Sequence, residues 1–135
     1  NIISVCKRGV NYLGNISKDC GINMVKVVIN TVYGGFGLSH KGIMTYAEKK
    51  GINLVFKETG SALLPYHYYV DEIKDENYFY QFEIERDDPA LVATVEELAE
   101  EANDQYSSLE VVEFPDGVKW TIAEYGGKEW VEIVH

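Results

Sequence analysis

The chain has 135 residues, of which 46% are hydrophobic and 13% aromatic, and its formal net charge at pH 7 is −10. This length is typical of one domain with its own core, and the apolar content excludes a disordered chain. No apolar run reaches the ~18 residues of a membrane-spanning helix. The negative charge repels nucleic-acid backbones and anionic membranes, so we expect neither general nucleic-acid binding nor membrane binding. A basic protein partner and a homo-oligomer stay open.

Residues 1–23 differ in composition from the rest of the chain. They contain both cysteines, Cys6 and Cys20, with three basic residues and one acidic residue. Met24 directly precedes the first predicted strand, so we expect an N-terminal extension followed by a single domain over 24–135. The two cysteines have no further metal ligands near them in the sequence, and the three histidines lack the spacing typical of metal ligands. We therefore predict no metal and no cofactor. With no signal-peptide hydrophobic segment in the sequence, we expect free thiols in a cytoplasm.

The first predicted elements form one strand–loop–helix unit. Val25–Thr31 is rich in β-branched residues and predicts a strand covered on both faces. A glycine-rich loop follows over Tyr33–Leu38. Ser39 is a suitable N-cap for the next helix, and Gly51 follows two lysines at its predicted end, where their charges suit the helix dipole.

The glycines of this loop favour a contact with an anion. Gly34, Gly35 and Gly37 can adopt positive φ and let the backbone approach another group closely. Backbone N–H groups at the following helix start would attract a negative charge. The alternative is a tight turn that needs glycine only for packing, and we weigh the two equally. GGFG matches neither the dinucleotide fingerprint nor the phosphate-binding P-loop.

The middle of the chain predicts three more strands. Ile52–Lys57 and Tyr66–Val70 are β-prone segments separated by turn residues, and Asp71–Asn77 is a charged turn. Tyr78–Arg86 shows the clearest alternation of the chain. Its predicted apolar face consists of Tyr78, Tyr80, Phe82 and Ile84.

The second helix is predicted over residues 89–103. Asp88 is a suitable cap, Pro89 occupies the first helical position, and apolar residues recur at helical spacing from Leu91 to Ala102. A run of glutamates on the opposite face is expected to contact water. These residues are Glu96, Glu97, Glu100 and Glu101.

The C-terminal third predicts a β-meander. Its strands are Leu109–Phe114, Val118–Glu124 and Glu129–Val134, separated by Asp-Gly and Gly-Gly turns. The elements together predict an α+β domain in which two helices pack on one mixed, mostly antiparallel sheet. Parallel pairing is expected only across connections that contain a helix.

Three segments resemble a family of small uncharacterised proteins encoded by tailed bacteriophages. They are INTVYGGFGLS (29–39), IERDDPALVATVEELAEEAN (84–103) and VVEFPDGVKWTIAEYGGKEWVEIVH (111–135). The resemblance covers most of residues 24–135 and leaves 1–23 outside. It implies expression in the cytoplasm of an infected bacterium and an accessory or counter-defence role, without an established activity to transfer.

Arg86 is the only arginine after residue 23 and ends the predicted aromatic strand. Arginine suits bidentate contact with phosphate or carboxylate, and the alternative is a salt bridge to Asp87 or Asp88. If its strand and Val25–Thr31 are parallel neighbours, Arg86 and the glycine loop meet at one sheet edge, where we also expect the 125–130 hairpin. The surplus aromatic residues, which include Tyr66 and Tyr68, could stack a base or form a protein interface. The candidate ligand-binding residues are Asn30, Thr31, Tyr33, Gly34, Gly35, Phe36, Gly37, Ser39, His40, Arg86, Tyr125 and Trp130.

Three hypotheses of function follow. The first is a binding protein without catalysis that holds a small anionic, nucleotide-derived ligand and sequesters a host defence signal. The second is an acidic interaction module that inhibits a basic host protein, based on the net charge and the glutamates of 89–103. The third, which we favour least, is a small nucleotide hydrolase, because no Ser-His-Asp arrangement or metal cluster supports catalysis. Its candidate residues are His40 or the C-terminal group Glu124, Glu129, Glu132 and His135.

Overall fold

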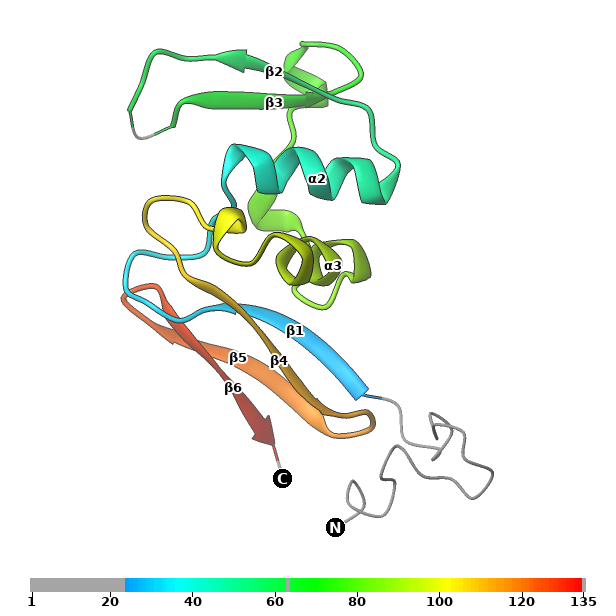
Figure 1. Ribbon diagram of the computed structural model, residues 1–135, viewed down its shortest axis with the longest axis vertical. Coiled ribbons are helices and arrows are strands. Elements are labelled where there is room, and N and C mark those ends of the chain that lie inside the picture. Colours follow the sequence, from blue (N-terminus) through cyan, green and yellow to red (C-terminus); the bar gives the residue numbers. More distant parts are fainter. Residues whose placement is uncertain (1–23, 63, 135) are drawn as a thin grey trace.

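The computed structural model describes residues 24–62 and 64–134. In this part of the chain, two α-helices and six antiparallel strands form an α+β domain, which confirms the predicted class (Figure 1). The predictions for residues 1–23, including Cys6 and Cys20, and for His135 lie outside the described residues. No helix within the described ranges is long and apolar enough to cross a membrane.

The elements follow the predicted order with one exception, the segment 78–86. The strands are β1 (Met24–Asn30), β2 (Leu54–Glu58), β3 (Tyr66–Val70), β4 (Leu109–Pro115), β5 (Lys119–Tyr125) and β6 (Lys128–Val134). The α-helices are α2 (His40–Lys50) and α3 (Pro89–Leu98), and the 3-10 helices are η1 (Asp75–Asn77), η2 (Gln81–Glu83) and η3 (Ala99–Ala102).

The helices lie between strands on both sides. Figure 1 shows, from top to bottom, the β2–β3 hairpin, α2, α3, the β1–β4 pair and the β5–β6 hairpin. β1 is covered on both faces, as predicted, because successive side chains of a strand point to opposite sides. Val28 packs in the core with the helices, whereas Val27 and Ile29 pack against side chains of the β5–β6 hairpin.

The strands form three two-stranded sheets, whereas the sequence suggested a single sheet. β4 pairs with β1 in an antiparallel register from Met24↔Pro115 to Asn30↔Leu109, and β5 pairs with β6. β4 has apolar residues on both faces, and its second face packs against Trp120 and Ile122 of β5. Placing the β5–β6 hairpin over this face buries apolar surface that edge-to-edge pairing of β4 with β5 would leave exposed.

The predicted strand over 78–86 is wrong. This segment contains η2 and irregular backbone, and Tyr78 alone forms an isolated β-bridge, to Tyr69 of β3. Phe82 is 71% exposed, whereas Ile84, from the same predicted face, is buried. The alternation therefore does not mark one buried face, since packing against neighbouring elements overrides β-propensity here. The sequence left open whether this segment pairs in parallel with β1, and in the structure β1 pairs with β4 alone among the described strands.

Both helix starts have the predicted caps. The Ser39 side chain accepts a hydrogen bond from the Gly42 N–H, and Gly51 ends α2 in the left-handed conformation. The Asp88 side chain accepts from the Ala90 N–H at 2.8 Å, with Pro89 at the first position of α3. The predicted 89–103 helix is α-helical to Leu98 and continues as η3.

The glutamates of α3 and η3 are exposed, as the sequence predicted, and three of the four also pair with lysines. The pairs are Lys26 with Glu96, Lys49 with Glu97 and Lys41 with Glu101. Exposed pairs of this kind contribute about 0–1 kcal/mol each to stability. Their main consequence is that this surface presents less net negative charge than the sequence suggested.

Candidate functional site

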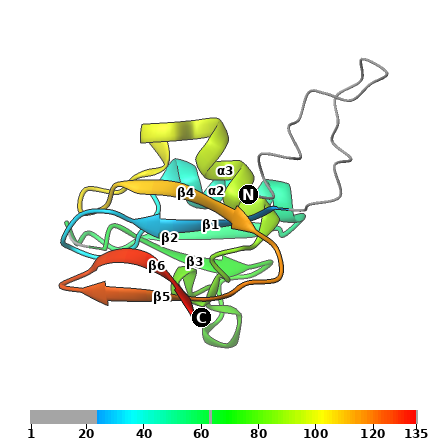
Figure 2. The same cartoon turned by 90° about the horizontal axis from the view of Figure 1, so that it is seen from below.

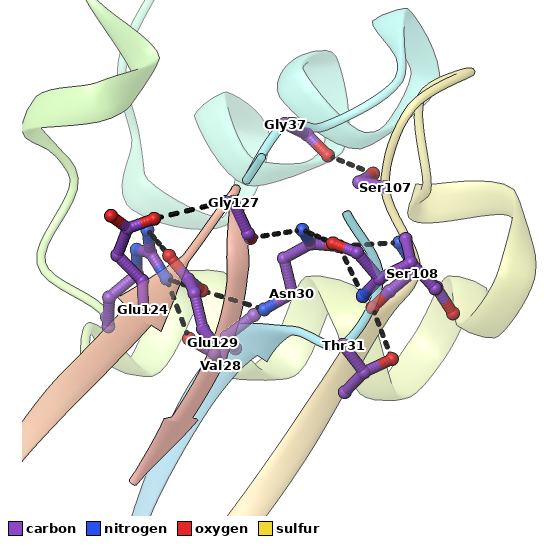
Figure 3. A network of polar contacts seen from close by, with 11 residues as sticks. Val28, Asn30, Thr31, Gly37, Ser107, Ser108, Glu124, Gly127 and Glu129 are labelled. Carbon is purple, nitrogen blue, oxygen red and sulfur yellow. Dashed lines mark hydrogen bonds and ion pairs between the residues drawn. The ribbon is translucent and has the colours of Figure 1, made fainter. Parts of the chain in front are cut away.

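Asn30, at the end of β1, connects three loops. Its fully buried side chain donates from Nδ2 to the carbonyls of Val32 and Gly127, at 2.6 and 2.7 Å, and accepts at Oδ1 from the Ser108 N–H at 2.9 Å (Figure 3). The neighbouring Thr31 hydroxyl donates to the Ser108 carbonyl at 3.1 Å. Asn30 and Thr31 therefore hold the loop after β1, the β5–β6 turn and the segment before β4 together.

The glycine loop packs tightly against its neighbours. The Gly34 N–H donates to the Gly126 carbonyl at 3.0 Å. A Cβ on Gly34, whose φ is 124°, would lie 2.6 Å from the Tyr106 carbonyl oxygen, and a Cβ on Gly127 would lie 2.3 Å from the Gly35 nitrogen. Gly37 accepts from the Ser107 hydroxyl at 2.7 Å. Close packing of backbones accounts for the glycines at 34 and 127.

Arg86 forms an internal ion pair with Glu129. Its Nη1 and Nη2 donate to the two Glu129 carboxylate oxygens at 2.6 and 2.8 Å, and the side chains are 22% and 9% exposed. The guanidinium carbon lies 3.9 Å from the centre of the Phe36 ring. The alternative of a salt bridge to the adjacent aspartates is wrong, since Asp88 binds Tyr46 and Lys50.

The predicted proximity of the glycine loop, Arg86 and the last hairpin is confirmed, but the arrangement differs from the expected one. Figure 2 shows that β6 is the strand of the β5–β6 hairpin that lies towards β1. Glu129 of β6 accordingly accepts a hydrogen bond from the Asn30 N–H of β1 at 2.8 Å. The three groups contact one another directly. Arg86 does not line the cavity that lies beside the glycine loop.

The C-terminal glutamates have other partners. Glu124 accepts from the Gly127 N–H at 3.0 Å, and Glu132 accepts from the Trp130 indole N–H at 3.2 Å. Within the described ranges, no group of three or more histidine, cysteine or acidic side chains could hold a metal ion. The hydrolase hypothesis gains no support from these residues.

A cavity of about 420 Å³ lies beside the glycine loop. Its walls come from this loop, the start of α2, β3, η2 and the 104–106 loop, together with Ala62, Leu64 and Pro65 from the connection between β2 and β3. Five predicted residues line it: Gly34, Gly35, Phe36, Ser39 and His40. Its size is in the range of small-molecule sites. The lining residues that the prediction did not include comprise aromatic and polar side chains, among them Tyr66, Tyr68, Gln81, Phe82, Asp104 and Tyr106.

His40, the first residue of α2, forms part of an aromatic wall. Its ring stacks on Tyr66 with 4.2 Å between ring centres, and its Nδ1 lies 2.7 Å from the Tyr68 hydroxyl. Burial lowers the pKa of the His40 imidazole. Burial, and to a smaller extent the neighbouring Tyr66, raises the pKa of the Tyr68 hydroxyl. Both side chains are therefore neutral at pH 7.

The lining of the cavity has little charge. Asp104 is its one acidic side chain, and none of the described lining residues is a lysine or an arginine. The cavity is therefore aromatic and weakly acidic, and it offers no basic side chain to a phosphate.

Comparisons with protein-family models, curated proteins and solved structures found no match to this chain. The resemblance to phage proteins stays a hypothesis.

The remaining predicted aromatic residues lie outside the cavity. Tyr33, Tyr125 and Trp130 are exposed, and the Lys128 ammonium lies 5.6 Å from the centre of the Tyr33 ring. The sequence singled out Tyr66 and Tyr68 as surplus aromatics. No sequence signal marked Asp104 and Tyr106, because only the fold brings their loop to the glycine loop.

We expect His40 to make stability fall with acidification. Its folded-state pKa is lowered, so the unfolded chain takes up the proton first as the pH falls below about 6.5. The contribution of neutral His40 is present above that pH and is lost as the pH falls towards the folded-state pKa. Urea unfolding between pH 7.5 and 5 should show a smaller loss of stability for His40→Gln than for the wild type. Equal losses would contradict this assignment.

Proposed function

We propose that this protein is a non-catalytic binding protein whose cavity holds the planar base of a small nucleotide-derived molecule. The observation that carries the proposal is the aromatic lining of the 420 Å³ cavity. Stacking of a base on an aromatic side chain contributes about 1–3 kcal/mol. Phe82 and Tyr106, which are 71% and 50% exposed, supply ring faces that a ligand can cover.

Polar groups among the aromatic residues suit the edge of a base. The Gln81 side chain accepts from the Leu38 N–H at 2.9 Å, which fixes the orientation of its amide at the cavity wall. The Gln105 amide donates to the Ala62 carbonyl at 3.3 Å across the cavity rim. A few fixed polar groups in an apolar wall are typical of sites that orient a small ligand.

The described lining residues include no lysine or arginine to bind a phosphate, so we expect the cavity to recognise the base of the ligand. Arg86, the arginine expected to bind an anion, is paired with Glu129, and the described lining offers no other guanidinium or ammonium group. A phosphate group would therefore extend towards solvent. In an infected bacterium, such a protein would sequester a nucleotide-derived defence signal.

The contacts of His40 suit a structural residue of the cavity wall better than a catalytic base. Its Nδ1 faces the Tyr68 hydroxyl, and its ring stacks on Tyr66. These contacts fix the ring within the aromatic wall, and burial lowers the pKa of the imidazole. The acidic-module hypothesis is not advanced, because lysines pair with three of the four glutamates on which it rested.

A ligand screen tests the proposal. Bases, nucleosides, nucleotides, cyclic dinucleotides and ADP-ribose are added to the full chain, and thermal unfolding is measured. A ligand at 100 times its dissociation constant should add about 2.7 kcal/mol of stability. Titration calorimetry then measures affinity for the best ligand.

Variants locate the site. Tyr106→Ala should weaken binding at least tenfold without lowering the melting temperature of the unliganded protein, since the ring is half exposed. Tyr125→Ala is the matched control, because Tyr125 is 73% exposed and outside the cavity. Absence of any thermal shift across the screen, or equal effects of the two variants, would overturn the proposal.

A further inference from the structure

The cavity combines aromatic ring faces with a single carboxylate. Tyr66, Tyr68, Phe82 and Tyr106 supply aromatic rings, and Asp104 supplies the negative charge. The face of an aromatic ring carries negative electrostatic potential and attracts cations, most strongly where water is excluded. Both kinds of group therefore favour a positive charge on the ligand.

Asp104 is held in place before a ligand binds. Its Oδ1 accepts from the Tyr106 N–H at 2.8 Å, and its own N–H donates to the Ser107 hydroxyl at 3.0 Å. An ideal Cβ on Gly37 would lie 2.0 Å from Asp104 Oδ2, so the backbone at Gly37 lies directly against the carboxylate in its observed position. A fixed carboxylate loses little freedom when it meets a cation, which favours affinity.

Among the described lining residues, no lysine or arginine competes with a cationic ligand for the Asp104 carboxylate. The one guanidinium of the described residues, that of Arg86, lies over the Phe36 ring and is paired with the Glu129 carboxylate. Burial lowers the pKa of His40, which keeps the imidazole neutral at pH 7. In the sequence, residues 24–135 carry 9 basic and 21 acidic side chains, a net charge of −12 (9 minus 21), and this field attracts cations.

We propose that the cavity selects a base with a positively charged ring, such as an N-alkylated purine or a pyridinium, over the neutral ring of the same shape. This inference rests on the proposed function and specifies the class of its ligand.

Matched ligand pairs test the preference by calorimetry at pH 7.5 and low salt. The pairs are 7-methylguanosine with guanosine and 1-methylnicotinamide with nicotinamide. In each pair, one methyl group places a positive charge on the ring. The nicotinamide pair decides the test, because 7-methylguanosine has partly lost its N1 proton at pH 7.5 whereas the charge of 1-methylnicotinamide is permanent. Burial of a methyl group alone accounts for about fourfold in affinity. We expect the charged member to bind at least tenfold more tightly, and 1-methylguanosine, which carries the methyl group without the charge, to bind no better than guanosine.

Two variants assign the preference to residues. Asp104→Asn keeps the side-chain shape and should reduce the ratio of affinities between the charged and neutral members to about fourfold or less. Phe82→Leu, at a 71% exposed position, keeps an apolar side chain and should weaken the charged ligands more than the neutral ones. The Phe82 variant is informative even if Asp104→Asn does not fold.

The outcomes separate the two proposals. Equal affinity for the charged and neutral members would overturn the inference and leave the binding function standing. A preference that both variants retain would also overturn the inference, because the charge would then be recognised elsewhere. No binding of any base, nucleoside or nucleotide would overturn both.

Discussion

Replacing Asn30 with alanine is expected to destabilise the protein by about 3–5 kcal/mol. The change removes the side chain that bonds the carbonyls of Val32 and Gly127 and the N–H of Ser108. Each buried polar group left without a partner costs about 1–3 kcal/mol. Domains are stable by only about 5–15 kcal/mol, so the loss is a large fraction of the total. Urea unfolding followed by circular dichroism measures it.

Thr31→Val is the matched control for Asn30. It alters the next residue and removes one hydrogen bond, from the Thr31 hydroxyl to the Ser108 carbonyl, while the shape stays the same. We expect a loss of about 1 kcal/mol. Amide exchange at Gly127 and Ser108 should accelerate in Asn30→Ala and change little in Thr31→Val. Equal losses of stability in the two variants would show that Asn30 does not organise the loops.

Replacing Arg86 with methionine is expected to cost about 3 kcal/mol, because the Glu129 carboxylate would lose its cation in a largely buried position. The Glu129 side chain is 9% exposed and would keep only the Asn30 N–H among its described hydrogen-bond donors. Arg86 does not line the cavity, so the effect should appear in urea unfolding. Ligand affinity should change little under conditions in which the variant is folded.

A double-mutant cycle separates the ion pair from the packing of the two side chains. Arg86→Met combined with Glu129→Leu removes both charges, and it should cost less than the sum of the single changes. Glu129→Gln keeps the acceptor for the Asn30 N–H and leaves Arg86 without its counter-charge. Strictly additive losses would mean that the 2.6 Å contact between Arg86 and Glu129 contributes no coupling energy.

The sequence by itself determined the local elements. Ser39 and Gly51 delimit α2, and Asp88 with Pro89 begins α3, since caps depend on hydrogen bonds within a few residues. The Gly-Gly turn between β5 and β6 was predictable for the same reason. The double-sided burial of β1 was visible in its run of β-branched residues.

Only the tertiary structure decided what these elements contact. The alternation in 78–86 suggested a strand, yet this segment shares no strand ladder with β1. Its one backbone–backbone hydrogen bond to β1 within the described residues runs from the Val28 N–H to the Arg86 carbonyl at 2.9 Å, and Arg86 Nη1 donates to the Val28 carbonyl at 3.3 Å. The carboxylate that pairs with Arg86 belongs to Glu129, 43 residues away in the sequence, and not to the aspartates beside it. Part of the candidate site also depends on contacts between segments distant in sequence, because Asp104 and Tyr106 reach the glycine loop through packing between loops. Periodicity and capping report interactions between near neighbours, whereas partners distant in sequence are selected by burial and by the satisfaction of polar groups in the assembled fold.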